Sequence, residues 1–600
     1  MKKIFSIVCA CLLALSAQAN SIDKYDALYE NLPFKMEKVT RPQFPANEVN
    51  LKDFGAIGDG STLCTDAFKK AIDALDQKGG GKLIVPQGVW FTGPITLKSN
   101  INLHIEKGGV ILFSADVNLY PLVETSFEGL DTRRCQSPIS GRNLQNVAIT
   151  GQGAIDGNGE YWRPLKKAKV TSAQWKEITS RGGAFKNPNY WFPSEAALKA
   201  DEKGADMNVP LGITTEEGWN EVKDYLRPVM VSLISCKNVW LNGVIFQNSP
   251  AWNIHPLMCE NVLIEDVLVR NPSFAQNGDG LDLESCKNAL IVNSTFDVGD
   301  DGICIKSGKD LDGRKRGIPC ENVIVDGCTV FKGHGGFVVG SEMSGGVKNI
   351  MVRDCQFLGT DVGLRFKSAR GRGGVVENIY IQDMSMFDIQ TDVITFDLYY
   401  GGKSAVEVLN DGDQKKQQVV DMKKVDETTP AFRNIDINHV ICRGARRAAY
   451  FNGLPEMPVQ NISIKDMEVN NAEQGIVINT SNLSEDWVGY CTIYGDSAGA
   501  FSPLGMYTTE EVIAIGRALG LPERFLIKPP SDGLTGKTDE DNLGFSYHAV
   551  NEYVRKGVAD PAIKEQIDHK HRVSRFKFET IPVYHNGLPI VIEDGTDFYK

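Results

Sequence analysis

Short segments of alternating apolar and polar residues recur along most of the chain. Examples are "VLIEDVLV" (262–269) and "VIVDGCTV" (323–330), whose β-branched residues favour strands. Each such segment follows an asparagine, which recurs at intervals of 23 to 29 residues and at longer intervals where insertions occur. These asparagines are Asn238, Asn261, Asn288, Asn322, Asn349, Asn378, Asn434 and Asn461. A repeat of this length, built from strands and turns, predicts an all-β parallel β-helix with the asparagine side chains stacked in one turn.

The cysteines follow the same repeat. Four lie two residues before a repeated asparagine and two lie six residues after one: Cys236, Cys259, Cys286 and Cys320, then Cys328 and Cys355. Equivalent positions on neighbouring coils lie about 4.8 Å apart, so these residues form columns. We favour buried free thiols, although a disulfide between coils is sterically conceivable. The chain has no CxxC or cysteine–histidine cluster that would predict a metal site.

Two long segments interrupt the repeat, at residues 161–227 and 401–430. Loops of this length on a solenoid usually shape a binding site. From about residue 479 the repeat stops, and "TTEEVIAIGRALGLPERF" (508–525) predicts a helix that starts at a Thr-x-x-Glu pattern. We therefore expect a β-helix domain over residues 20–478 and a separate α/β segment over residues 479–600.

Charge and the N-terminus narrow the class of protein. The 600 residues carry a net charge of −12, which argues against nucleic acid and anionic membranes as partners. Lys2 and Lys3 precede an apolar run over 4–16 and a small-residue cleavage site, Ala17-Gln18-Ala19. This pattern predicts a signal peptide over residues 1–19 and export to the periplasm or the extracellular space. No later stretch is long and apolar enough to predict a transmembrane helix.

Charged residues fall at one phase of the repeat on successive coils. Asp300 follows Asn288 by twelve residues, and His334 follows Asn322 by twelve. Asp301 lies beside Asp300, and the same face is expected to carry Asp279 one coil before this pair and Arg365 and Lys367 one coil after His334. Clustered carboxyl groups beside cations suit acid-catalysed cleavage of a glycosidic bond, because neighbouring negative charge keeps one carboxyl protonated. The two cations would bind an acidic sugar, the arginine with a bidentate grip on its carboxylate.

Four ordered motifs, "NGDG" (277–280), "VGDDG" (298–302), "KGHGG" (332–336) and "LRFK" (364–367), resemble those of the family 28 glycoside hydrolases, the polygalacturonases. Gly278 and Phe366 replace the threonine and isoleucine that are usual in that family. The resemblance covers about residues 45–478 and implies a right-handed, pectin-lyase-like β-helix. It also implies a pectic polysaccharide as substrate, hydrolysis of α-linked galacturonic acid with inversion, and no cofactor or metal.

The resemblance assigns a role to each motif residue. Asp300 is the general acid, Asp279 and Asp301 position and activate the water, and His334 tunes the acid. The predicted substrate-binding residues are Asn277, Arg365, Lys367 and a tyrosine near the cleaved sugar, for which Tyr399 and Tyr400 are both candidates and Tyr400 is taken forward.

Several alternatives stay open at this point. The family includes rhamnogalacturonan and xylogalacturonan hydrolases, both endo and exo, and the bulky insertions, including 307–319, suggest a blocked groove and exo action. A polysaccharide lyase of the pectate-lyase type shares the β-helix but needs calcium and a basic residue that abstracts a proton. A non-catalytic carbohydrate-binding β-helix would not need the polar column.

The last fifth of the chain resembles the C-terminal part of the NAD synthetases. The matching positions that would contact metal or nucleotide in that family are Glu485, Lys528, Asp539 and Glu540. The Ser-Gly-Gly-x-Asp-Ser loop with which the family holds ATP does not occur in this sequence. We therefore predict a partial, non-catalytic segment that packs poorly because half of its usual fold is missing.

Overall fold

The computed structural model describes residues 24–204, 208–210, 212–400, 423–454, 456–475, 482–490, 502–531 and 537–577. The predicted signal peptide and most of the 401–430 interruption lie outside these ranges. The chain divides into two compact units. Unit 1 comprises residues 1–403, 424–446 and 459–472, and unit 2 comprises 404–423, 447–458 and 473–600.

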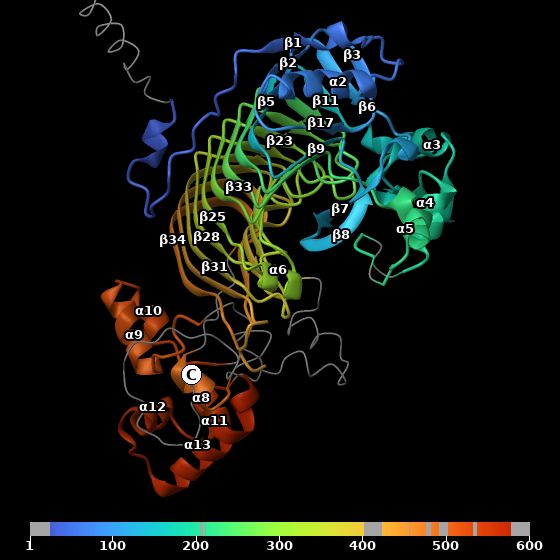
Figure 1. The fold of residues 1–600 in the computed structure, drawn as a ribbon. Coiled ribbons are helices and arrows are strands. Elements are labelled where there is room, and N and C mark those ends of the chain that lie inside the picture. Colours follow the sequence, from blue (N-terminus) through green and yellow to red (C-terminus); the bar gives the residue numbers. More distant parts are fainter. Residues whose placement is uncertain are drawn as a thin grey trace, which may run out of the picture. The chain divides into compact units, whose positions relative to one another are not determined.

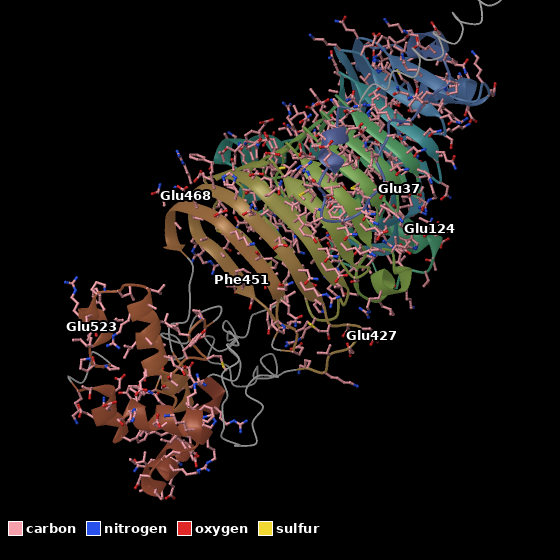
Figure 2. All side chains as sticks on the ribbon, turned by 90° about the vertical axis from the view of Figure 1, so that its left-hand side faces the viewer. Glu37, Glu124, Glu427, Phe451, Glu468 and Glu523 are labelled. Carbon is pink, nitrogen blue, oxygen red and sulfur yellow. The ribbon has the colours of Figure 1, made fainter. Side chains whose placement is uncertain are left out.

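Unit 1 is a right-handed parallel β-helix, as predicted, in which three parallel ladders of short strands run side by side along the solenoid (Figures 1 and 2). The ladder that we call the site ladder contains β4 (Ile95–Thr96), β9 (Ile139–Arg142), β15 (Val231–Ile234), β18 (Ile254–Leu257), β21 (Leu281–Glu284), β24 (Ile303–Lys306), β27 (Phe337–Val339), β30 (Val362–Lys367) and β32 (Asp392–Asp397).

The asparagine ladder contains β1 (Glu48–Asn50), β2 (Gly81–Val85), β5 (Ile101–Ile105), β10 (Gln145–Gly151), β16 (Lys237–Asn242), β19 (Glu260–Glu265), β22 (Lys287–Val292), β25 (Cys320–Asp326), β28 (Val347–Arg353), β31 (Val375–Phe387) and β33 (Ala431–Asn452). The third ladder contains β3 (Gly88–Thr92), β6 (Gly109–Phe113), β11 (Ala154–Asp156), β17 (Ile245–Gln247), β20 (Leu268–Arg270), β23 (Thr295–Asp297), β26 (Thr329–Phe331) and β29 (Gln356–Leu358), which pairs with the second half of β31.

The predicted asparagine stack is present in the asparagine ladder. Asn261 Nδ2 donates to Asn238 Oδ1 at 3.1 Å, and Asn349 Nδ2 donates to Asn322 Oδ1 at 3.0 Å. Each of these residues has a φ between 56° and 59°, a left-handed conformation that asparagine tolerates better than most residues. The stack extends to β34 (Gln460–Gly475), where Asn461 donates to Asn434 at 2.8 Å. The asparagine therefore satisfies both the turn geometry and the hydrogen bonding between coils.

The interior of the solenoid is apolar and contains the predicted cysteine columns. All ten cysteines of the described residues are buried, and none of them forms a disulfide. The backbone N–H of Cys259 donates to the Cys286 sulfur on the next coil at 3.4 Å, and burial raises the pKa of the Cys259 thiol. The structure thus contains free thiols that pack as small apolar residues.

The first coil is covered by the helix α2 (Thr65–Asp76), whose apolar face is buried. An N-terminal segment over residues 24–41 packs Tyr25 and Val39 against outward-facing residues of the asparagine ladder, including Leu263, Leu290 and Ile324. Several coils are therefore covered by one segment that precedes the solenoid in sequence.

The 161–227 interruption is folded rather than extended. It contains α3 (Ser172–Thr179), α4 (Glu195–Asp201), α5 (Glu216–Val222) and an antiparallel sheet of β12 (Leu165–Lys166), β14 (Tyr190–Phe192) and β13 (Ala184–Asn187). We call this segment the insertion; it gathers at one side of the solenoid beside a hairpin of β7 (Leu122–Phe127) and β8 (Leu130–Cys135) (Figure 1). The shorter interruption at 307–319 forms α6 (Asp310–Arg316), and Arg316 forms ion pairs with Glu284 at 2.7 Å and with Asp131 on β8 at 3.2 Å.

The described part of the C-terminal segment is helical. It consists of α8 (Leu483–Trp487), α9 (Thr509–Ala518), α10 (Glu523–Leu526), α11 (Asp539–Leu543), α12 (Tyr547–Lys556) and α13 (Pro561–Ser574). The predicted Thr-x-x-Glu start is a capping box formed by Thr508 and Glu511. The helices enclose a buried cluster that includes Trp487, Val550 and Ile567, which differs from the expectation of a poorly packed segment. By contrast, Phe525 and Ile527 on and after α10 are largely exposed.

No helix among the described residues combines the length and apolarity that a membrane crossing requires.

Candidate active site

The predicted site residues lie on four neighbouring strands of the site ladder and on the turns before them. The strands β21, β24, β27 and β30 pair in this order. From coil to coil, the site residues are Asp279, Asp300, Asp301, His334, Arg365 and Lys367. The structure thus brings together the whole column that the sequence predicted.

The three acids meet at one point although they come from two coils. Asp279, Asp300 and Asp301 each offer a carboxylate oxygen, and these oxygens lie within 4.8 Å of one another. Asp300 and Asp301 are adjacent but diverge, because they occupy a turn between β23 and β24. The Asp300 side chain is 24% exposed and that of Asp301 only 2%. One acid of the pair therefore faces solvent and the other faces the protein.

Two glycines allow this close approach. A Cβ on Gly299 would lie 2.5 Å from the carbonyl oxygen of Ser273, so the turn before Asp300 packs directly on the loop of the previous coil. A Cβ on Gly278 would lie 2.7 Å from the Cβ of Ala275, so there is no room for the threonine that the family motif usually has here. The other departure from the motif, Phe366, points into the solenoid and stacks on Phe396 at 4.4 Å between ring centroids.

Asp301 is held as a carboxylate by two cations. Lys367 Nζ lies 2.6 Å from Asp301 Oδ2, and Arg365 Nη1 lies 3.3 Å from Oδ1. Burial alone would raise the pKa of Asp301, but the charges of Lys367 and Arg365 outweigh it and hold this pKa below its usual range. Both oxygens of Asp301 are thereby occupied by donors from β30.

The pKa of Asp279 is shifted in the opposite direction from that of Asp301. Burial raises the pKa of its carboxyl group well above the usual range, and the neighbouring charges of Asp300 and Asp282 raise it further. Its Oδ1 atom is buried without a hydrogen-bond partner among the described residues. Because three carboxylates this close cannot all be ionised, Asp279 is the member that keeps a proton most readily.

His334 contacts the exposed acid. Its Nδ1 atom lies 3.0 Å from Asp300 Oδ1, and its Nε2 atom lies 3.8 Å from Asp361. The hydrogen bond to Asp300 raises the pKa of the His334 imidazole, although burial acts in the other direction. The histidine and Asp300 therefore form a hydrogen-bonded pair at the solvent side of the cluster.

The two remaining predicted residues flank the cluster. Tyr400 is partly exposed, with Lys367 Nζ 4.8 Å and the Arg365 guanidinium carbon 5.6 Å from its ring centroid, whereas Tyr399 is buried. This arrangement favours Tyr400 as the tyrosine of the site. Asn277 does not face the cations; its Oδ1 accepts a hydrogen bond from Arg227 Nη2 at 2.9 Å.

Arg227 is a site residue that the sequence reasoning missed. It is buried at the end of the insertion, and its Nη1 atom also donates to the carbonyl oxygens of Pro250 at 2.9 Å and Gln276 at 3.0 Å. These contacts fix the loop that carries Asp279. These contacts of Arg227 could not be predicted from the sequence, because two of the acceptors are backbone atoms and the third, on Asn277, is 50 residues from Arg227.

A second missed group is a buried charge network beneath the acids. Lys306 Nζ forms ion pairs with Glu342 at 2.8 Å and Asp282 at 3.5 Å, and lies 4.8 Å from the Trp252 ring centroid. Burial lowers the pKa of Lys306, but these neighbouring negative groups outweigh it and keep the lysine charged. Asp282 and Lys306 belong to "NGDGLD" and "ICIK", so their place three residues after Asp279 and five after Asp301 could have indicated them.

The acid cluster is close enough to bind a cation, but Lys367 and Arg365 already balance the charge of Asp301. The arrangement therefore offers one solvent-facing acid, one permanently ionised carboxylate, one buried carboxyl that readily keeps a proton, and cations beside them. This set can protonate a leaving oxygen and accept a proton from water.

Comparisons with known proteins agree with this chemistry. The family model "Glycosyl hydrolases family 28" matches residues 215–442, and the NAD synthase model matches residues 462–585. A probable polygalacturonase of Vitis vinifera is 28% identical over 437 residues, which cover 71% of this chain and 75% of that protein.

Solved structures extend the likeness to the fold. The exopolygalacturonase of Thermotoga maritima is 35% identical, with a TM-score of 0.58, and the match covers 73% of this chain and 90% of that one. The family 28 exopolygalacturonase of Yersinia enterocolitica is 23% identical with a TM-score of 0.52, over 72% of this chain and 79% of that one, and shows the same fold.

Proposed function

Because this chain belongs to family 28 of the glycosyl hydrolases and is an O-glycosyl hydrolase, we propose that it hydrolyses α-linked galacturonic acid in pectin. The observation that carries the proposal is the junction of three acids with Arg365 and Lys367 on one face of the solenoid. The acids supply proton transfer, and the cations match the carboxylates of an acidic sugar chain.

Asp300 acts as the general acid in this proposal. It is the exposed member of the cluster, so it can reach the glycosidic oxygen, and its partner His334 can balance its charge after it gives up the proton. Asp301 acts as the base, because its lowered pKa keeps it ionised and ready to accept a proton from water. Asp279, which keeps its own proton readily, positions that water by hydrogen bonding.

The reaction inverts the configuration at the cleaved carbon in this proposal. In many glycosidases the two carboxyl groups are about 6.5–9.5 Å apart for inversion and about 5 Å apart for retention. The oxygens here approach more closely than the inverting range. However, both oxygens of Asp301 contact cations, which suits a base better than a nucleophile that must form a covalent bond. NMR of the first-formed product tests this: inversion of an α-linkage gives the β-anomer first, and initial α-anomer would contradict it.

Exo action is the proposed mode of cleavage. The insertion approaches the loop before β21 through Arg227, and α6 is fixed to the sheet by Arg316. Bulk of this kind beside the acids would leave room for a chain end rather than for a continuous chain. The Thermotoga maritima relative is named an exopolygalacturonase.

Product analysis on polygalacturonate tests the substrate and the mode together. We expect galacturonic acid as the first product, and an Asp300→Asn chain should release about 10²–10⁴-fold less. Mixed oligomers as first products would overturn the exo mode. Hydrolysis of rhamnogalacturonan or xylogalacturonan in place of polygalacturonate would show that the chain acts on a different pectic polysaccharide. Unsaturated sugar ends would indicate a lyase.

Two further proposals concern the ends of the chain. Residues 1–19 act as an export signal, so the mature protein should begin near residue 20 when recovered from the periplasm or the medium. The C-terminal segment does not synthesise NAD, because the sequence lacks the loop that holds ATP in that family. Incubating the chain with ATP, Mg²⁺, ammonia and the deamidated dinucleotide should yield no NAD.

A further inference from the structure

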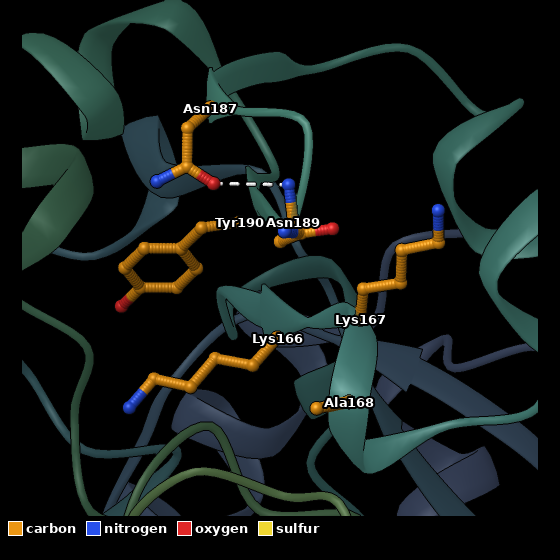
Figure 3. Close-up of a pocket in the computed structure, with 6 residues that line it drawn as sticks. All are labelled: Lys166, Lys167, Ala168, Asn187, Asn189 and Tyr190. Carbon is orange, nitrogen blue, oxygen red and sulfur yellow. Dashed lines mark hydrogen bonds between the residues drawn. The ribbon is translucent and has the colours of Figure 1, made fainter.

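A pocket of about 560 Å³ lies on the insertion, apart from the acid cluster. Its volume is within the range of about 300–1,000 Å³ that is typical of small-molecule sites. The lining residues, drawn in Figure 3, are Lys166, Lys167, Ala168, Asn187, Asn189 and Tyr190. They come from the end of β12 and the 3-10 turn that follows it, from the end of β13, and from the start of β14 with the turn before it.

The lining is basic although the chain as a whole is acidic. Lys166 and Lys167 contribute two ammonium groups, and no carboxylate lines the pocket. Among the described residues neither lysine has an ion-pair partner, whereas the nearby Lys186 is paired with Asp201. Figure 3 shows the Lys166 and Lys167 side chains extending in different directions, so they can reach two separate anionic groups.

The other lining groups suit a sugar. The Tyr190 ring is half-buried, and Lys166 Nζ lies over it at 5.7 Å from the ring centroid, so an aromatic ring and a cation meet in the lining. The Asn187 Oδ1 atom accepts the backbone N–H of Asn189 at 2.9 Å, and this bond leaves the Asn187 amide nitrogen available as a donor. An aromatic face, amide donors and cations match the ring, the hydroxyls and the carboxylates of an acidic oligosaccharide.

The pocket is connected to the active-site loop. The Tyr190 hydroxyl lies 3.5 Å from the Gln276 side-chain oxygen, and Gln276 directly precedes Asn277. Arg227 binds the Gln276 carbonyl oxygen on the same loop. A chain held in the pocket would therefore lie next to the loop that carries Asp279.

From these observations we propose that the pocket on the insertion is an accessory binding site for an acidic oligosaccharide, bound through Lys166, Lys167 and Tyr190. The proposal rests on the proposed function for the identity of the sugar, galacturonate. The site holds a second portion of substrate or released product beside the catalytic cluster and raises the affinity for long chains.

Calorimetric titration of the full-length Asp300→Asn chain with trigalacturonate tests the proposal. We expect two binding sites per chain. The added substitutions Lys166→Ala and Lys167→Ala should remove one of them. The matched control is Lys169→Ala with Lys176→Ala, which removes equal charge from the same insertion outside the pocket and should leave both sites. In the chain that retains Asp300, the pocket substitutions should raise KM for polygalacturonate about fivefold, as expected for two exposed ion pairs.

Three outcomes would overturn the proposal. The first is unchanged stoichiometry and KM in the pocket variant, and the second is an equal loss in the control variant. The third is equally tight binding of maltotriose at the pocket, because that sugar carries no carboxylate. If the wild-type chain does not hydrolyse polygalacturonate, the proposed function fails, but the titration still decides whether the pocket binds the acidic sugar.

Discussion

Two adjacent aspartates at this site differ in exposure and in their contacts. Asp300 and Asp301 are neighbours in sequence, yet Asp300 faces solvent and His334 while Asp301 is buried against Lys367. On a regular strand the two side chains would face opposite sides of the sheet, so the turn after Gly299 is what brings both into one cluster with different surroundings. The division between acid and base that we propose for this pair therefore depends on backbone geometry rather than on residue type.

Replacing Asp300 should change the titration of His334. The hydrogen bond that the protonated imidazole donates to Asp300 is the main cause that raises the His334 pKa, so in the Asp300→Asn chain this pKa should fall toward or below 6.5, the ordinary value. NMR of the imidazole across pH measures it. Asp361→Asn is the control, because that carboxylate lies farther away, at 3.8 Å, and should have a smaller effect. An unchanged His334 pKa in Asp300→Asn would show that Asp300 does not raise it.

Removing the Lys367 charge should shift the acidic limb of the pH profile. In the proposed mechanism Asp301 must be ionised to accept a proton, and its lowered pKa keeps it ionised into the acid range. In Lys367→Met this pKa rises, so kcat/KM should be lost at a higher pH as the solution is acidified. Lys348→Met, which removes a surface lysine paired with Glu321, should leave the profile in place. An unshifted acidic limb in Lys367→Met would remove Asp301 from the role of base.

At the scale of elements, the loop before β21 depends on the insertion. Arg227 donates to three oxygens of two loops, and these contacts hold Gln276 and Asn277 in place. We expect Arg227→Met to lower kcat about 10–100-fold, because a small displacement of Asp279 misaligns the reacting groups. Its effect on KM should be smaller, and Arg227→Lys should restore part of kcat.

Arg181→Met is the matched control for Arg227, since Arg181 lies on the same insertion but is paired with surface carboxylates. It should leave kcat within about twofold of wild type, as expected for the loss of exposed ion pairs. An equal loss of kcat in both variants would show that Arg227 supports only the fold of the insertion.

One carboxylate of the solenoid, that of Glu265, accepts several hydrogen bonds where the N-terminal segment packs. Glu265 accepts hydrogen bonds from Tyr25, Arg41 and Trp240, each at 2.8 Å. Burial would raise its pKa, but these donors lower it to about 2 from the ordinary 4.5. A lowered pKa means that the stabilisation is complete above pH 4.5 and disappears as the pH falls toward 2.

Glu265→Gln should therefore lower the free energy of unfolding by about 2 kcal/mol at pH 7, as expected for charge-assisted hydrogen bonds. The difference from wild type should shrink steadily between about pH 4.5 and 2. Urea unfolding at several pH values measures it, and Glu260→Gln, at an exposed pair with Lys237, is the control. A difference that is independent of pH would contradict the assigned ionisation.

The repeat made the solenoid and the acid column predictable. Asn288 and Asn322 mark the same turn on successive coils, so counting from them placed Asp300 and His334 together. The contacts of Arg227 were not predictable, because the insertion has no repeat to count from and two of the acceptors are backbone carbonyls. Lys306 was missed for another reason: a lysine on an alternating strand predicts exposure, and only its burial against Asp282 and Glu342 reveals the network.

At the scale of the whole molecule, the chain joins two units with different kinds of core. Unit 1 repeats one coil, and every predicted site residue from Asn277 to Tyr400 belongs to it. Unit 2 contains a helical cluster around Trp487 and Val550 that has no repeat. The family 28 match, 215–442, lies in unit 1 except for residues 404–423, and the NAD synthase match, 462–585, begins within β34 of unit 1 and continues through unit 2. The catalytic chemistry and the C-terminal helices are therefore separable in principle.

Hydrolysis should survive the loss of the C-terminal helices. A chain that ends at residue 478 keeps β34 and its Asn461 contact to Asn434, and thus the stacked asparagines of the last described coil. We expect its kcat/KM on polygalacturonate to remain within about twofold of the full chain, since no site residue is removed. A Val550→Asp substitution in the intact chain is the second test, because it places a charge in the helical cluster without shortening the solenoid. A truncated chain that shows β-rich circular dichroism and cooperative unfolding but no hydrolysis would prove that the C-terminal unit contributes to catalysis, and the same loss in Val550→Asp would confirm it.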